Sequence, residues 1–380
     1  MKEYIQQLKP TLDSVYEYLH GHPEISWKEY KTTEYIQHFL QERGFTVQTF
    51  DDCPGLVSEV GTGEFCIALR TDMDALWQEV AGQFQANHSC GHDAHMTIVL
   101  GTMLLLQKLN VPTAVKLKFI FQPAEEKGTG ALKMIEKHVL DDVNFLYGVH
   151  LRPIQELQDG QAAPAIYHGA AKFLTGEIHG EDAHGARPHL GQNAIEIGAS
   201  IINEMKSIHL DPMVPYTAKM TKFHAGSESG NIIPGKASFS IDLRAQTNKV
   251  MNELTEKIET IVQSIAKIYG VEVTLETKAS VAAAEVSKEA QHFMKKAIIE
   301  SLDKNRLKDP IITSGGEDFH FYTLKNPDIK ATMLGLGCDL QPGLHHPKMT
   351  FNRNAIYTGI EILAKTVWNT IEAYKAGELA

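Results

Sequence analysis

Residues 88–95 read HSCGHDAH, which places three histidines, one cysteine and one aspartate within eight positions. Imidazole and thiolate groups are good ligands for zinc, manganese, cobalt and nickel, and a thiolate argues against calcium or magnesium. No second C-x-x-C pair and no H-x(3–5)-H pair lies nearby to close a structural tetrahedron around Cys90 and His92. The stretch therefore indicates part of a metal site whose other ligands lie elsewhere in the chain.

Other metal-capable side chains follow hydrophobic segments that have the character of buried strands. They are Asp72 and Asp74 after residues 65–71, Glu125 and Glu126 after residues 116–122, His150 after residues 144–149, and His345 and His346 in the loop after residues 331–337. In an open parallel sheet, ligands bind beyond the carboxyl ends of the strands. Each of these residues alone could be structural, but segments that converge on one edge favour a functional metal site.

The adjacent glutamates Glu125 and Glu126 permit a division of labour. Successive residues at the end of a strand point in different directions, so one glutamate can bind metal while the other deprotonates a metal-bound water. A second ion would help to lower the pKa of that water and to polarise a substrate carbonyl. These residue types therefore predict metal-assisted hydrolysis.

Other catalytic systems are poorly supported. There is no G-x-S-x-G elbow, because Glu228 occupies the middle of GSESG at 226–230. H-E-x-x-H and P-loop motifs are absent, and the GTG triplets at 61–63 and 128–130 are too short to indicate phosphate binding.

Composition and charge exclude some partners. The formal net charge of −11 argues against nucleic acid or an anionic membrane as the main partner. No apolar run reaches the roughly 18 residues of a membrane span, and the first residues predict an amphipathic helix rather than a signal sequence. The four cysteines show no paired short spacing, which favours a reducing cytoplasm over a disulfide framework.

Hydrophobic periodicity predicts the elements that position these residues. Amphipathic helices are expected at about 2–19 and 29–43, before a strand at 45–50. Three buried strands then alternate with two helices, in the order 65–71, 94–109, 116–122, 130–140 and 144–151. This β-α-β-α-β order predicts a mostly parallel sheet with helices on both faces.

The pattern changes after about residue 170. The next elements follow the ferredoxin-like order: strand 172–181, helix 192–208, strands 216–226 and 237–246, helix 248–270 and strand 271–280. The α/β pattern then resumes with a helix from about 287, a strand at 331–337 and a terminal helix at 354–376. For 380 residues two domains are the natural expectation. We expect an α/β catalytic domain of residues 1–170 and 284–380, interrupted by an inserted α+β lid of residues 171–283.

Eight motifs, taken in chain order, carry a resemblance to a known family: RTDMDAL, SCGHDAH, FQPAEE, GVH, AHGARPHLG, NIIP, GGEDF and LHHP. Together they resemble the amidohydrolase branch of the co-catalytic di-metal metallopeptidases, which contains aminoacylases, hippurate hydrolases and indole-acetyl-amino-acid hydrolases. The resemblance covers almost the whole chain. It implies that the inserted domain is a lid through which two copies form a homodimer.

The resemblance assigns roles residue by residue. The implied ligands of two divalent transition-metal ions are Cys90, His92, Glu126, His150 and His345. The implied catalytic residues are Glu125 as general base, His184 as an oxyanion donor from the lid, and Asp74 as a carboxylate that orients a ligand. The implied substrate-binding residues are Asn231 and Arg244, although Arg244 would equally fit an ion pair on a strand face. The other polar residues of HSCGHDAH are expected to support the ligands or to start the following helix.

The sequence departs from the family pattern between RTDMDAL and HSCGHD. Trp77 stands where the family usually has proline, and the stretch from there to Cys90 is shorter by several residues. This loop is expected to lie near the substrate cleft, so a preference for a particular acyl group does not transfer from the resemblance.

The expected function is hydrolysis of the amide bond of an N-acyl amino acid or a similar small amide, with zinc, manganese, cobalt or nickel as the metal. A dipeptidase or carboxypeptidase that acts on small peptides is a second hypothesis. A metal-containing binding protein without catalysis is a third. His184 could act on its own site or on that of a partner copy.

Overall fold

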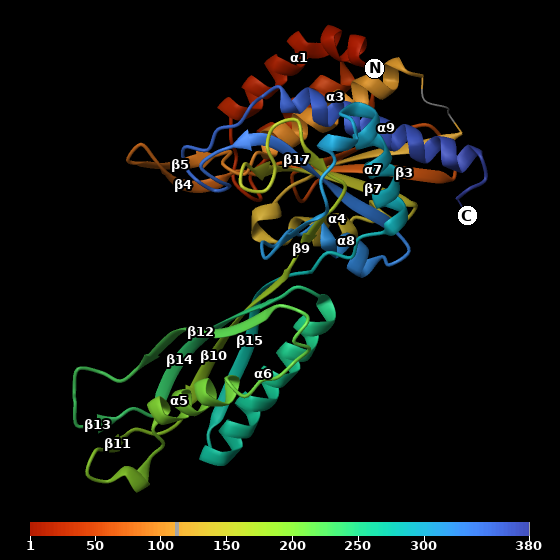
Figure 1. Ribbon diagram of the computed structural model, residues 1–380. Helices are drawn as coiled ribbons and strands as arrows, with labels where there is room; N and C mark the ends of the chain where they lie inside the picture. The colour runs from red at the N-terminus through yellow and green to blue at the C-terminus, as the bar shows by residue number, and fades with distance from the viewer. Residues whose placement is uncertain (111–113, 380) are drawn as a thin grey trace. The chain divides into compact units, whose positions relative to one another are not determined.

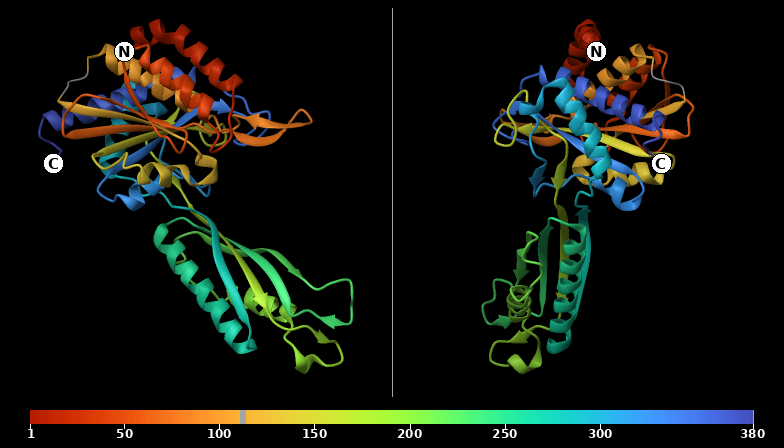
Figure 2. Two further views of the ribbon diagram at one scale, coloured as in Figure 1. Left: turned by 180° about the vertical axis from the view of Figure 1, so that it is seen from behind. Right: turned by 45° about the vertical axis from the view of Figure 1, so that its right-hand side comes forward.

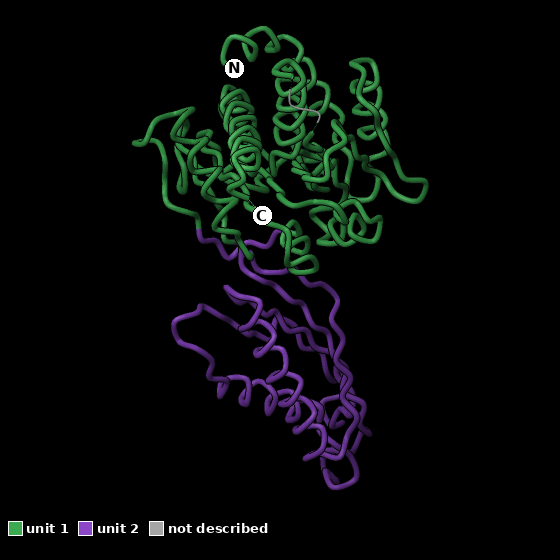
Figure 3. Tube along the Cα trace, turned by 90° about the vertical axis from the view of Figure 1, so that its right-hand side faces the viewer, with its two compact units in different colours: residues 1–167, 285–311, 318–380 green, residues 168–284, 312–317 purple. Residues whose placement is uncertain are grey.

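The computed structural model describes residues 1–110 and 114–379. The chain divides into two compact units (Figure 3). Unit 1 comprises residues 1–167, 285–311 and 318–380, and unit 2 comprises residues 168–284 and 312–317. The middle of the chain thus forms a unit of its own, to which the short segment 312–317 also belongs.

Unit 1 is built on a seven-stranded sheet with the strand order β1-β2-β6-β3-β7-β17-β8 (Figure 1). In that order the strands are β1 (Thr46–Thr49), β2 (Leu56–Val60), β6 (Val115–Gln122), β3 (Phe65–Asp72), β7 (Phe145–Pro153), β17 (Lys330–Leu340) and β8 (Ala162–Ala163). The four strands from β6 to β17 run parallel, and the outer strands pair in antiparallel. The predicted α/β class with a mostly parallel central sheet is confirmed.

Helices cover both faces of this sheet (Figures 1 and 2). They are α1 (Lys2–Gly21), α2 (Tyr30–Gln41), α3 (His92–Lys108), α4 (Gly130–Glu136), α7 (Lys288–Ser301), α8 (His320–Lys325) and α9 (Ala355–Lys375). Helix α3 packs against the sheet and against α1 and α9, and its residues 92–106 are all buried. This position explains why its sequence is apolar all round rather than amphipathic.

Periodicity alone misses β2 and a hairpin formed by β4 (Leu76–Val80) and β5 (Gln83–Asn87). All ten hairpin residues are half-buried or exposed, so the hairpin has no buried face that would impose an alternating pattern. Helix α3 begins at His92, two residues before its expected start, so its first turn carries a candidate ligand.

Unit 2 contains a four-stranded antiparallel sheet with the order β12-β14-β10-β15. Its elements, in chain order, are β10 (Ala170–His179), α5 (Ala194–Met205), β12 (Tyr216–Ala225), β14 (Lys236–Ala245), α6 (Asn248–Tyr269) and β15 (Glu272–Val281). Helices α5 and α6 pack on one face of the sheet around a core of their own (Figure 2). The predicted ferredoxin-like order is confirmed.

Several short strands and turns lie between the main elements. In unit 2, β11 (Ala183–His184) pairs with β13 (Ile232–Ile233), and the turn η2 (Pro188–Leu190) lies between β11 and α5. Strands β9 (Ile166–His168) and β16 (Ile311–Thr313) pair where the chain passes from one unit to the other, and η3 (Lys304–Arg306) follows α7. Among the helices of the described residues, none has the length and apolar character needed to cross a membrane.

Close packing of α3 against α1 and α9 gives a test of the fold. A Cβ atom at Gly101 would lie 2.3 Å from Cδ1 of Ile360 and 3.2 Å from Cδ2 of Leu12, both of which are buried. Gly101→Val should therefore lower the free energy of unfolding by about 1–3 kcal/mol through overpacking, measured by urea unfolding. Gly21→Val is the control, because no heavy atom lies within 4 Å of a Cβ there. Equal stability of the two variants would contradict the packing.

Candidate metal centre

Five segments of unit 1 bring metal-capable side chains to the carboxyl ends of the parallel strands. They are Asp72 at the end of β3, Cys90 and His92 at the start of α3, Glu125 and Glu126 in η1 (Glu125–Lys127) after β6, His150 in β7, and His345 in the loop after β17. Because β3, β6, β7 and β17 are parallel, their carboxyl ends meet at one edge of the sheet.

The five predicted ligands form two groups that share one cysteine. The ligand atoms of Cys90, His92 and His150 lie within 4.8 Å of one another, and so do those of Cys90, Glu126 and His345. Within the first group, Sγ of Cys90 is 3.6 Å from Nε2 of His150. Within the second, Nε2 of His345 is 3.3 Å from Oε1 of Glu126. Cys90 is thus a member of both groups, and its thiolate would be available to an ion held by either.

Two buried atoms in these groups lack a hydrogen-bond partner. They are Nε2 of His92 and Oε1 of Glu126, neither of which has such a partner among the described residues. A buried polar atom left unpaired is costly, so its presence calls for a ligand. Imidazole nitrogen, thiolate sulfur and carboxylate oxygen together are a donor set for a transition metal, so the residues present fit such an ion.

Hydrogen bonds orient both ring ligands of the first group. Nδ1 of His92 donates to the carbonyl oxygen of Asp74 at 2.8 Å, and Nδ1 of His150 donates to the carbonyl oxygen of Leu151 at 2.7 Å. Each bond places the ring proton on Nδ1, so Nε2 is the nitrogen of each ring that can accept. Both rings therefore present the nitrogen that faces the other group members.

The carboxylate of Asp74 holds the turn that carries the two glutamates. It accepts hydrogen bonds from the backbone N–H groups of Glu125 at 3.2 Å and Glu126 at 3.0 Å, and from Oγ of Ser26 at 2.6 Å. Burial favours the neutral acid, but hydrogen bonds from His92 and Ser26 hold the pKa of Asp74 below its ordinary value. Asp74 thus supports the site rather than facing the space between the ligands.

The two glutamates differ in their surroundings. Glu126 belongs to the group with Cys90 and His345, whereas Glu125 belongs to neither group that contains Cys90. Oε2 of Glu125 and Oε1 of Glu126 each lie 3.9 Å from Nε2 of His92, and their side chains are 10% and 11% exposed. Membership of the groups that contain Cys90 therefore separates the two glutamates, whereas their distance from His92 and their exposure do not.

Glu29, which precedes α2, was not among the predicted site residues. Its Oε1 accepts a 2.7 Å hydrogen bond from the N–H of Ala124, which adopts a left-handed conformation with a φ of 54° just before the glutamates. Burial, and then the charge of Asp74, raise the pKa of Glu29 to about 8. A second carboxyl group therefore secures the same turn. Glu29 lies in an ordinary-looking helix start, so local sequence gave no indication of it.

A buried charge network lies beneath the ligands. Arg70 bonds the carboxylates of Asp72 at 2.7 Å and Asp318 at 2.8 Å, and all three side chains are buried. Asp72 in turn accepts a 2.8 Å hydrogen bond from Nδ1 of His95, whose Nε2 accepts from the N–H of Leu151 at 3.0 Å. The arginine in the apolar run FCIALRT is the sequence feature that could have revealed this network, because a charge in a fully buried strand needs partners.

The predicted lid residues fall at two ends of unit 2. His184 lies in β11, and the N–H of Gly185 donates to the carbonyl oxygen of Asn231 at 2.8 Å, so His184 and Asn231 are neighbours. Arg244 lies near the far end of β14, where it makes two hydrogen bonds to Asp242 at 2.8 and 2.9 Å. This pairing raises the pKa of Arg244. The structure brings the first two residues together and leaves Arg244 apart from them, in the strand-face ion pair that the sequence left open.

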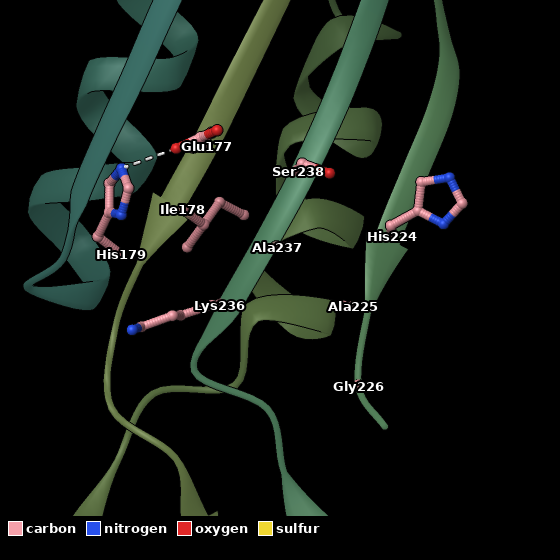
Figure 4. A pocket seen from close by; sticks show the side chains of 9 residues that line it. All are labelled: Glu177, Ile178, His179, His224, Ala225, Gly226, Lys236, Ala237 and Ser238. Atoms are coloured by element: carbon pink, nitrogen blue, oxygen red, sulfur yellow. Dashed lines mark ion pairs between the residues drawn. The ribbon is translucent and has the colours of Figure 1, made fainter. Parts of the chain in front are cut away.

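A hollow of about 400 Å³ lies on unit 2 at the end of the sheet that leads into β11 and β13 (Figure 4). Side chains of β10, β12 and β14 line it, among them His179, His224 and Lys236. Nε2 of His179 lies 3.6 Å from Oε2 of Glu177. The hollow is open to solvent, and its lining combines one cation, Lys236, with one anion, Glu177.

The fold and the centre define a hydrolase-like α/β unit with a potential two-ion site and an inserted α+β unit. The family model described as peptidase family M20/M25/M40 matches residues 68–369, and the chain belongs to this family. Membership confirms the predicted family and the predicted class of enzyme, a hydrolase that acts on C–N bonds.

Individual relatives align over nearly the full length. The chain is 30% identical to a probable hydrolase of Synechocystis sp., over 97% of this chain and 98% of the relative. It is 27% identical to the N-acetyl-L-cysteine deacetylase of Bacillus subtilis, over 99% and 92%. A crystal structure of a dinuclear metal-binding peptidase of the M20 family from Bacillus subtilis superposes with a TM-score of 0.82 at 23% identity, over 97% and 99%. This last likeness shows the shared fold.

The raised pKa of Glu29 predicts a pH-dependent stability. Between pH of about 4.5 and 8 the unfolded chain loses this proton while the folded chain keeps it, so the free energy of unfolding should fall as pH rises through that window. Glu29→Gln has no proton to lose. Relative to the wild type it should gain at most about 4 kcal/mol between pH of about 5 and 8, measured by urea unfolding of metal-free protein.

Glu34→Gln is the control for this comparison, because Glu34 lies in α2, the helix that Glu29 precedes, and has an exposed side chain. Its stability should follow that of the wild type at every pH. A constant difference between Glu29→Gln and the wild type across the window would contradict the assignment.

Proposed function

We propose that this chain is a metal-dependent amidohydrolase that releases an amino acid from an N-acyl amino acid or a similar small amide. The observation that carries the proposal is the pair of ligand groups that share Cys90, with Glu125 beside them but in neither. The aligned N-acetyl-L-cysteine deacetylase supports a substrate that is a small N-acylated amino acid.

Two divalent transition-metal ions would occupy the two ligand groups, one held by Cys90, His92 and His150 and the other by Cys90, Glu126 and His345. Zinc, manganese, cobalt and nickel all suit this mixture of sulfur, nitrogen and oxygen donors. When bound, the ions would supply Lewis-acid activation of a water molecule and of the scissile carbonyl group. The crystal structure of the dinuclear M20 peptidase supports two ions rather than one.

Glu125 is the proton carrier of the proposed reaction. Its carboxylate takes a proton from the attacking water and returns it to the leaving nitrogen, which becomes an amine. The hydrogen bonds of Asp74 to the N–H groups of Glu125 and Glu126 fix the turn, so the base and the ligand keep a constant spacing. Preorganisation of this kind lowers the cost of reaching the transition state.

The lid would complete the reaction. Nδ1 of His184 accepts a 3.0 Å hydrogen bond from the N–H of Ala186, so the proton of a neutral ring lies on Nε2. That N–H group would donate to the oxygen that gains negative charge as the carbonyl is attacked. Asn231, the neighbour of His184, would hold the substrate, and Arg244 would contribute from a different end of unit 2.

We further propose a reducing, cytoplasmic environment for the enzyme. All four cysteines are buried and unpaired, including Cys90, whose thiolate must stay reduced to bind metal. Action on peptides rather than acyl amino acids remains the second hypothesis, and it differs only in the group that the substrate pocket accepts.

The general base gives the direct test. Glu125→Gln should lower kcat for a good N-acyl substrate by about 10²- to 10⁴-fold, because the neutral amide cannot accept the proton. Bound metal, measured by elemental analysis, and the unfolding transition should stay close to those of the wild type. Glu126→Gln is the matched control, because it should lose metal as well as activity. Full activity of Glu125→Gln would refute the mechanism.

Substrate preference of the wild type decides between the three hypotheses. The panel contains N-acetyl amino acids, N-benzoyl amino acids and dipeptides, each assayed with the metal-loaded wild type. Preference for the acylated compounds supports the proposal, and preference for dipeptides supports the peptidase. Absence of turnover on every compound, with ligand binding retained, supports the binding protein.

The inserted unit carries an apolar stripe that suits a homodimer. Ile195, Ala199 and Ile202 recur on one side of α5 with helical spacing, and all three are exposed, Ile195 at 50% and Ile202 at 37%. Strand β12 is an edge of the same sheet and is free to pair. A two-fold contact between such surfaces would bury both stripes at once.

The double substitution Ile195→Lys and Ile202→Lys should convert the dimer to a monomer in light scattering coupled to size-exclusion chromatography, because it places charges in the apolar contact. Ile268→Lys is the control, since Ile268 is 75% exposed on the other helix of the unit and should leave the dimer intact. A dimer that persists in the double variant, or a wild type that is monomeric, would refute an interface through α5.

A further inference from the structure

The hairpin of β4 and β5 occupies the stretch where the sequence departs from the family pattern (Figure 1). Its two turn residues, Ala81 and Gly82, have φ angles of 52° and 84°, as expected for a tight two-residue hairpin. The hairpin register pairs Leu76 with Asn87 and Gln78 with Gln85. Cross-strand partners share a face, so Gln78, Gln85 and Asn87 lie on the same side.

Two amide side chains on this face hold the loop that carries His345. Nε2 of Gln78 donates to the carbonyl oxygen of His345 at 3.1 Å. Nδ2 of Asn87 donates both to Oε1 of Gln78 at 2.8 Å and to the carbonyl oxygen of Pro347 at 3.1 Å. The two amides therefore form one connected bracket across residues 345–347.

His345 needs such support because its backbone is strained. Its φ of 64° lies in the left-handed region, which side chains other than glycine rarely adopt. Its N–H donates to the carbonyl oxygen of Ser89 at 2.7 Å, and its C=O accepts from Gln78. Both backbone groups of this residue are thus held by the hairpin or by the residues that link it to Cys90.

The two ligand groups depend on this bracket unequally. In the first group, Cys90 precedes α3, while His92 and His150 lie in α3 and β7, and all three residues are buried in unit 1. The other group takes His345 from an exposed loop, and the side chain of His345 is 53% exposed. Cys90, which follows the hairpin by three residues, belongs to both groups, whereas His345, whose C=O is bonded by Gln78, belongs to the second alone.

We propose that Gln78 and Asn87 are positioning residues that fix His345 as a metal ligand, and so make the site of Cys90, Glu126 and His345 selectively dependent on the β4–β5 hairpin. The inference rests on the proposed function only in taking these two groups as metal sites. It adds that the short stretch before Cys90 sets the affinity of the site of Cys90, Glu126 and His345 for its metal ion.

The test is a titration of metal-free protein with Co²⁺, read from the ligand-field and thiolate-to-cobalt absorption bands and from competition with a chromophoric chelator. Gln78→Met and Asn87→Leu keep most of the side-chain volume and remove the bracket. Each should weaken one of the two Co²⁺ sites by about 10- to 100-fold, the range for loss of a group that orients a ligand. The other Co²⁺ site should keep its wild-type affinity and serves as the internal control.

The matched control variant is Gln85→Met. Gln85 lies opposite Gln78 on the same face, and its exposed side chain makes no hydrogen bond with the described residues. It should bind both ions as the wild type does. The combined Gln78→Met and Asn87→Leu variant should lose less than the product of the two single effects, because both residues belong to one chain of hydrogen bonds.

Hydrolysis supplies a second readout. Since His345 itself is intact, excess metal should restore the kcat of both variants to near the wild-type value, whereas a disrupted active site would stay impaired.

Equal weakening of both Co²⁺ sites, or a lower melting temperature of the metal-free variants with no selective loss, would overturn the proposal by showing a general role in folding. Unchanged binding in Gln78→Met and Asn87→Leu would also overturn it. A wild type that binds fewer than two Co²⁺ ions would instead refute the two-ion centre of the proposed function.

Discussion

The metal centre depends on one buried carboxylate. Asp74 receives the N–H groups of Glu125 and Glu126, and its own carbonyl oxygen receives the Nδ1 proton of His92. Three residues from two segments, η1 and the start of α3, are therefore held by a single residue in the loop after β3. An ionised carboxylate buried without partners would be very costly, so the same hydrogen bonds that position the glutamates also make the charge of Asp74 tolerable.

The other buried charges near Asp74 are also paired. Arg70 compensates Asp72 and Asp318 in the interior, and Asp72 orients His95, which reaches the backbone of β7. These contacts join the ends of β3 and β7 with the start of α3, so the strands that deliver ligands are tied together by buried charges as well as by the sheet. A chain of satisfied polar groups of this kind specifies one arrangement, because every alternative leaves a charge unpaired.

The ligands differ in how firmly the fold holds them. His92 and His150 lie on elements that are buried by the core of unit 1, whereas His345 lies on an exposed loop in a strained conformation. A loop cannot draw on core packing, so amide hydrogen bonds from a neighbouring hairpin replace it. The inserted unit has its own core, and the residues that distinguish it, the pair His184 and Asn231 and the apolar stripe of α5, lie on its surface.

The sequence determined the parts that depend on local pattern. Fully buried strands are continuous apolar runs, so β3, β6, β7 and β17 could be read directly, and the polar residues that follow them identified the edge of the sheet. The ferredoxin-like unit followed from the order of its elements. The ligand candidates followed from residue type, and their separate roles from a family resemblance rather than from geometry.

Only the tertiary structure decided which of these residues meet. The sharing of Cys90 between two groups, the support of the glutamate turn by Glu29 and Asp74, and the bracket of Gln78 and Asn87 all join residues far apart in the chain. The hairpin escaped prediction because neither of its faces is buried, and Arg244 proved to be remote from His184 because strand register, not residue type, sets that distance. The local pattern of apolar and polar residues reflects which residues become buried. Contacts between residues far apart in the chain form only when the whole chain packs.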